Sequence, residues 1–129
     1  MTAQLISPTI HGILDYLLGA VLVVAPSVLG LPTGPAVIAY AVGGAHLAMS
    51  LLTGYAPGAL RVIPFWAHGA VEAAGWAGLL VFLGLLTAPA DGLFLASGVG
   101  ILVVSALTDY GVETDGVRLR ARRHAHARP

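Results

Sequence analysis

Hydrophobic residues fill most of the chain in four long stretches, and short polar or turn-forming segments separate them. A helix needs about 20 consecutive apolar residues to cross a bilayer, and each stretch approaches or exceeds that length. Because the connections are short, consecutive helices should be antiparallel neighbours. The pattern predicts an all-α integral membrane protein, an up-down four-helix bundle with transmembrane helices over Pro8–Leu31, Pro35–Ala56, Ile63–Ala88 and Gly92–Tyr110.

The composition excludes several classes of protein. Of the 129 residues 57% are hydrophobic and 9% are charged, whereas a soluble domain carries about 25% charged residues. The chain has no cysteine and no lysine, which excludes thiolate metal sites and Schiff-base cofactors. No phosphate-binding glycine motif occurs, and we expect no binding of nucleic acid. Aromatic residues near the predicted helix ends are expected to form interfacial belts: Tyr16, Tyr40, Tyr55, Phe65, Trp66 and Tyr110.

Basic residues lie in only two regions, the second loop, which contains Arg61, and the segment after the fourth stretch. By the positive-inside rule, both termini and the second loop are predicted to be cytoplasmic. Residues 113–129 are predicted to form an Arg/His-rich cytoplasmic tail. We favour a disordered, topogenic role for this tail over specific binding of anionic lipid headgroups. The candidate headgroup ligands are Arg118, Arg120, Arg122 and Arg123.

A polar motif occurs twice within the apolar stretches. His11-Gly12-Ile13-Leu14-Asp15 is followed later in the chain by His68-Gly69-Ala70-Val71-Glu72, and Ser50–Tyr55 similarly matches Ser105–Tyr110. These matches predict a tandem duplication of a two-helix hairpin, with a pseudo-twofold axis along the membrane normal. The transmembrane domain would then span 1–112, with one repeat over about 1–56 and the other over about 57–112.

The segment from Leu18 to Gly30, preceded by the Asp15-Tyr16 pair, resembles the SPW-repeat family of small bacterial integral membrane proteins. The resemblance covers about one hairpin, and Ala25-Pro26-Ser27 stands where the family has Ser-Pro-Trp. It implies a four-helix membrane protein with a duplicated hairpin and no defined activity. Together with the charge distribution, it implies a multi-pass protein of the bacterial inner membrane.

The repeated motif places a histidine and a carboxylate on one face of each helix, four residues apart. Ionisable groups inside a membrane usually face a protein interior or a water-filled cavity. At 1.5 Å per residue, His11 and His68 lie about 5 Å, and Asp15 and Glu72 about 10–12 Å, inside their helix starts, and His46 is at a similar depth. We expect these five residues to meet in the inner-leaflet half. The expected pocket-lining residues are Gly12, Gly69, Ser50, Ser105 and Asp109.

Three functions remain open at this point. His11, Asp15, His68 and Glu72 could bind a transition metal of the Zn/Fe/Mn class as an N2O2 set, with His46 as a fifth donor. Alternatively, His11 and His68 could be the axial ligands of a b-type haem. Either cofactor favours redox or electron transfer, with a redox partner or quinone. The other two functions are a cofactor-free proton or small-solute relay and a small structural or partner-docking subunit. The abundance of glycine also favours a homo-oligomer.

Overall fold

The computed structural model describes residues 5–86 and 90–111, which are helical apart from turns, loops and two isolated bridges. Helix α1 spans Pro8–Val28 and α2 spans Thr33–Leu52. The third helix runs continuously through α3 (Phe65–Val71), the π-helical segment η1 (Glu72–Trp76) and α4 (Ala77–Leu86), and α5 spans Asp91–Leu107. The prediction of an all-helical fold is confirmed. The first three helices are long and apolar enough to cross a membrane, and α5 is a shorter apolar helix, which together indicate a multi-pass membrane protein.

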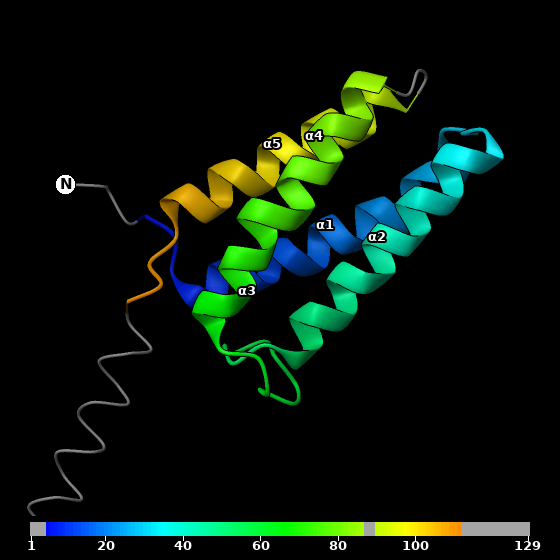
Figure 1. The fold of residues 1–129 in the computed structure, drawn as a ribbon. Helices are drawn as coiled ribbons and strands as arrows, with labels where there is room; N and C mark the ends of the chain where they lie inside the picture. Colours follow the sequence, from blue (N-terminus) through cyan, green and yellow to red (C-terminus); the bar gives the residue numbers. More distant parts are fainter. Residues whose placement is uncertain (1–4, 87–89, 112–129) are drawn as a thin grey trace, which may run out of the picture.

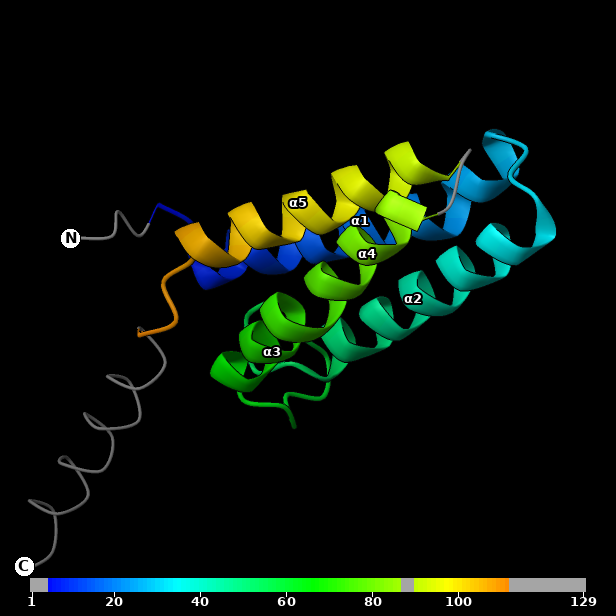
Figure 2. The same ribbon diagram turned by 45° about the horizontal axis from the view of Figure 1, so that its top comes forward.

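The helices form two hairpins, with α1 beside α2 and α4 beside α5 (Figures 1 and 2). Within the second hairpin α5 also contacts η1, and between the hairpins α5 contacts α1. Small residues allow close approach within each hairpin. A Cβ at Gly43 of α2 would lie 3.1 Å from the carbonyl oxygen of Gly19 in α1, and a Cβ at Gly98 of α5 would lie 3.0 Å from that of Ala77 in α4.

Backbone hydrogen bonds join helix ends at one end of the bundle. The amide of Leu5 donates to the carbonyl of Leu107 at 2.9 Å, which links the start of α1 to the end of α5. At the same end of the bundle, the amide of Gly54 donates to the carbonyl of Ile63 at 2.8 Å, which links the end of α2 to the segment before α3. Both hairpins therefore bring their helix ends to the same end of the molecule (Figure 1).

Several helices end earlier than the hydropathy pattern predicts. Helix α1 ends at Val28, and Gly30 beyond it has a left-handed φ of 63°, which glycine adopts without steric cost. Helix α2 ends at Leu52 and α5 at Leu107 because Thr53 and Thr108 have extended backbones. The apolar residues that follow in the sequence belong to loops, so hydropathy alone placed these ends too late.

The π-helical segment begins at Glu72, the carboxylate of the second motif, and this residue is buried. A π-bulge adds a residue to one turn and changes the direction of the side chains that follow. It was not predicted, because the apolar pattern continues through it. The predicted tail, with the four arginines named as candidate headgroup ligands, lies outside the described residues.

Candidate metal site

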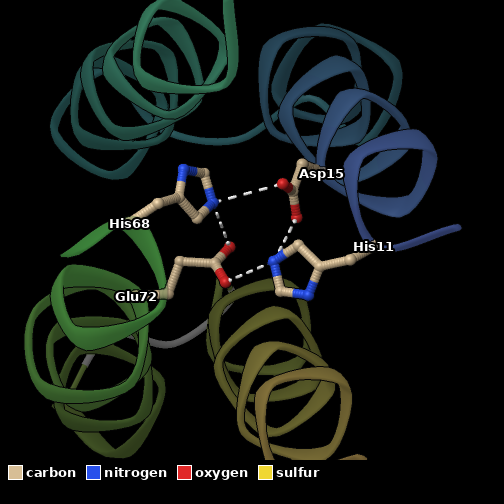
Figure 3. A group of neighbouring side chains, drawn as sticks. All are labelled: His11, Asp15, His68 and Glu72. Atoms are coloured by element: carbon tan, nitrogen blue, oxygen red, sulfur yellow. Dashed lines mark ion pairs between the residues drawn. The ribbon is translucent and has the colours of Figure 1, made fainter. Parts of the chain in front are cut away.

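Two helices bring four ionisable side chains together in the buried interior. His11 and Asp15 come from α1, His68 from α3 and Glu72 from the start of η1, and none is more than 3% exposed. One ligand atom of each residue can be chosen so that all four lie within 4.8 Å of one another. Figure 3 shows the two imidazoles facing each other across the space that the carboxylates flank. The prediction of a buried His/carboxylate group that could hold a metal ion is confirmed.

The shortest contacts in this group cross between the helices. His11 Nε2 lies 2.9 Å from Glu72 Oε2, and His68 Nε2 lies 3.2 Å from Asp15 Oδ2. The contacts within each helix are longer, at 3.4 Å from His11 Nε2 to Asp15 Oδ1 and 3.5 Å from His68 Nε2 to Glu72 Oε1. Each histidine therefore lies closer to the carboxylate of the other helix than to the carboxylate of its own helix, and the site is formed by both hairpins together.

Two threonines fix the orientation of the imidazoles. His11 Nδ1 lies 2.8 Å from Thr108 Oγ1, and His68 Nδ1 lies 2.7 Å from Thr53 Oγ1. Each hydroxyl donates its one hydrogen to the carbonyl four residues earlier, in the helix that the threonine follows, so it can only accept from the histidine. Each imidazole thus carries a hydrogen on Nδ1, and its Nε2 is left for the centre of the group. Metal-binding histidines are commonly held in this way.

Neither Nε2 atom makes a hydrogen bond within the described part of the chain, although carboxylate oxygens lie close to both. The N–H direction of a protonated Nε2 would deviate too far from the line to the nearest carboxylate oxygen for a hydrogen bond to form. Figure 3 shows that both Nε2 atoms are directed toward the space between the carboxylates. Two nitrogen lone pairs and two carboxylates therefore converge on a common point, which is the arrangement that a cation requires.

The charge of the group favours a divalent ion. Two carboxylates with two neutral imidazoles carry a net charge of −2, and burial of unpaired charge is costly. Arg61, the one arginine among the described residues, donates instead to the loop carbonyls of Gly58 and Ala56. Metal–ligand distances of about 2.0–2.2 Å place tetrahedral donors about 3.3–3.6 Å apart. The nitrogen–oxygen contacts in this group are 2.9–3.5 Å, and one donor atom from each residue lies within 4.8 Å of the others, so the donors would move somewhat closer together around an ion.

His46 lies beside the four residues without belonging to the closest group. It is completely buried, and its Nε2 is 3.7 Å from Glu72 Oε1 and 4.0 Å from Asp15 Oδ1. Neither of its ring nitrogens has a hydrogen-bond partner among the described residues. Its role as a fifth donor stays a prediction.

A haem does not fit between the two imidazoles. The rings of His11 and His68 have centroids 5.6 Å apart, and the carboxylates of Asp15 and Glu72 lie within 3.5 Å of both Nε2 atoms. A porphyrin would occupy the space of these carboxylates. Gly12, one of the expected pocket-lining residues, leaves no space for a porphyrin edge because the ring of Tyr55 covers it.

Aromatic residues close one end of the site, which corrects their predicted place in an interfacial belt. Tyr55 and Phe65 are buried, with ring centroids 5.6 Å apart, and Phe65 also packs 4.7 Å from Tyr110. The Tyr55 hydroxyl donates to Asp15 Oδ2 at 2.9 Å. Burial raises the pKa of Tyr55 and raises the pKa of Tyr110 to about 12, so both phenols are neutral at physiological pH.

The predicted site residues did not include the threonines and tyrosines, although these lie in the repeated segments Ser50–Tyr55 and Ser105–Tyr110. Their recurrence beside the His/carboxylate repeat is the signal that could have identified them. The rings of Tyr55 and Tyr110 pack on Gly12 and Gly69, where a Cβ would overlap them. These glycines therefore make room for the aromatic residues that close the site.

The remaining predicted pocket residues have different surroundings. Ser105 donates to Glu72 Oε2 at 3.3 Å, so it touches the four-residue group. Ser50 donates to the backbone carbonyl of His46 at 2.9 Å. The carboxylate of Asp109 accepts from the amide of Gly111 at 2.8 Å and is not one of the four grouped ligands.

We expect Thr53→Val and Thr108→Val each to weaken metal binding by about 10–100-fold, because valine keeps the shape but cannot accept from the imidazole. Competition of the purified protein with a chelator of known affinity measures the effect. Thr33→Val, at the exposed start of α2, is the matched control and should bind as the unmodified protein does. Equal affinities in all three variants would show that the threonines do not orient metal ligands.

No protein-family model, no curated protein and no solved structure matches this chain, so its function has to be inferred from the site itself.

Proposed function

We propose that this protein is an integral membrane metalloprotein that binds one divalent transition-metal ion of the Zn/Fe/Mn class. The ligands are His11, Asp15, His68 and Glu72. The observation that carries the proposal is the pair of buried Nε2 atoms without hydrogen bonds, each fixed by a threonine on the opposite ring nitrogen. An ion of this class supplies Lewis acidity and, where its valence changes, single-electron transfer.

The proposal places the ion in the inner-leaflet half of a bundle made from two homologous hairpins, with both termini in the cytoplasm. Two contacts support the duplication, since His11 pairs with Thr108 and His68 with Thr53. These are corresponding positions in the two halves of the sequence. The cytoplasmic orientation rests on the distribution of arginine.

A proton relay without a cofactor is the second candidate function. Its support is an unbroken series of nitrogen–oxygen distances from 2.9 to 3.7 Å that joins His11, Glu72, His68 and Asp15 and reaches His46. Such chains of histidine and carboxylate carry protons in membrane pumps and transporters. A relay protein purifies without metal, and the proposed metalloprotein does not.

Elemental analysis of detergent-purified protein tests the proposal. We expect about one equivalent of a divalent transition metal per chain, because the described residues contain one N2O2 set. In the variant Asp15→Asn/Glu72→Gln, the metal content should become substoichiometric, since both charges that balance the ion are lost.

Asp91→Asn/Asp109→Asn is the matched control for the loss of two charges. Asp91 begins α5 and Asp109 follows it, and neither is among the four grouped ligands. This control should keep its metal. Unmodified protein that remains metal-free after expression with supplied zinc, iron and manganese would refute the metalloprotein and leave the relay and the structural or partner-docking subunit.

A further inference from the structure

We infer that a lateral cavity between α1 and α5 binds a membrane-dissolved amphiphile that has an uncharged, hydroxyl-bearing ring, of the phenol or quinol class, and a long aliphatic tail. The inference deepens the proposed function, because the cavity is lined by two of the proposed metal ligands. It depends on their carboxylates but does not require that the metal be present.

The cavity has a volume of about 250 Å³. Its walls are aliphatic, with Leu14 and Leu18 on α1 and Ile101 and Val104 on α5, and within the described part of the chain Asp15 and Glu72 are its only ionisable lining residues. A cavity of about 150 Å³ in another protein accommodates benzene, so this volume is sufficient for a substituted six-membered ring. The cavity is therefore a ring-sized apolar space, and the buried side chains of Asp15 and Glu72 form part of its wall.

The cavity opens toward the hydrocarbon region. Leu17 and Val21, which line it, are 58% and 48% exposed on the apolar surface of α1. These two residues also line a second, wholly apolar groove of about 420 Å³, which continues along α1 to Leu29. From Asp15 to Leu29 the helix rises about 21 Å. Leu17 and Val21 therefore connect the cavity, which would hold the ring of the amphiphile, to the groove, which would hold its aliphatic tail.

The depth of the cavity in the membrane and the charge of its lining residues determine which kind of polar headgroup a bound amphiphile can have. Asp15 lies about 12 Å along α1 from its N-cap, Ser7, which places the carboxylate below the level of phospholipid headgroups. In the metal-free protein a phosphate would also be repelled by the carboxylates of Asp15 and Glu72. An uncharged hydroxyl can reach this depth and donate a hydrogen bond to a carboxylate oxygen, whether or not that carboxylate also binds a metal ion.

Photo-crosslinking in phosphatidylcholine nanodiscs tests the inference. The probe is a long-chain alkylphenol that carries a diazirine, and its methyl ether serves as a probe that cannot donate a hydrogen bond. We expect the phenol to label peptides that contain Leu14–Val21 and Gly100–Val104, and excess unmodified alkylphenol to suppress this labelling. The methyl ether should label these peptides only at background level.

Gly100→Leu should abolish the labelling, because residue 100 lines the cavity and a Cβ there meets no other atom within 4 Å. Gly44→Leu is the matched control. A Cβ at this α2 glycine is equally unobstructed, but the residue does not line the cavity. This variant should be labelled as the unmodified protein is.

Each sample is analysed for metal and labelled with and without a chelator. Specific labelling that persists in metal-free protein supports the amphiphile site even if the metal proposal fails. Equal labelling by the phenol and its methyl ether would show that ordinary lipid chains fill the groove, and would overturn the inference. Labelling unaffected by Gly100→Leu would overturn it as well.

Discussion

Replacement of both His11 and His68 by alanine is expected to abolish stoichiometric metal binding. The change removes both nitrogen donors and leaves Asp15 and Glu72 as the only members of the four-residue group. Two carboxylates without imidazole favour harder ions and give no four-coordinate transition-metal site. The metal content should therefore fall from about one equivalent per chain to background, a larger loss than that expected for the threonine variants.

The control for this double variant is His124→Ala/His126→Ala, which removes two histidines from the tail and leaves the four-residue group unchanged. Elemental analysis and circular dichroism should be run on the same samples, so that loss of metal is separated from loss of helix. A folded His11→Ala/His68→Ala protein that retains a full equivalent of metal would contradict the assigned ligand set.

Replacement of Gly12 by leucine is expected to cause the largest loss of stability. A Cβ at this position would overlap the ring of Tyr55 and lie 2.9 Å from Cγ of Pro57. The tyrosine cannot turn aside without loss of its hydrogen bond to Asp15 and its packing on Phe65. Overpacking of a buried site typically costs about 1–3 kcal/mol, and a whole leucine side chain at this contact should reach or exceed the upper value.

Thermal unfolding in detergent measures this effect against Gly78→Leu in α4, where a Cβ would meet no other atom within 4 Å. Gly78→Leu should unfold near the temperature of the unmodified protein, and Gly12→Leu should unfold well below it or fail to accumulate. Similar unfolding temperatures for the two variants would show that Tyr55 does not pack rigidly on Gly12.

The sequence predicted the helices and the ionisable residues of the site for the same physical reason. A long apolar run indicates a membrane helix, and the few ionisable residues inside it must turn toward one another. From this principle alone, His11, Asp15, His68 and Glu72 are predicted to face one another, as they do in the structure. The hairpin duplication, the orientation in the membrane and the resemblance to SPW-repeat proteins stay predictions.

The surroundings of the site were harder to predict because they depend on tertiary contacts. Thr53 and Thr108 reach the histidines because each adopts an extended backbone just after a helix, where hydropathy predicts that the helix continues. Tyr55 and Phe65 lie near helix ends, and this position suits an interfacial belt as well as a buried cap. Only the packing of their rings over the site distinguishes the two roles.

X-ray absorption spectroscopy at the edge of the bound metal tests the metal site most directly. We expect a first shell of nitrogen and oxygen donors at about 2.0–2.2 Å. Outer-shell scattering should correspond to two imidazoles, and it should disappear in the His11→Ala/His68→Ala protein together with the metal. An ion without imidazole scattering, or one whose spectrum is the same in that variant, would contradict a centre built from the two repeated His/carboxylate motifs.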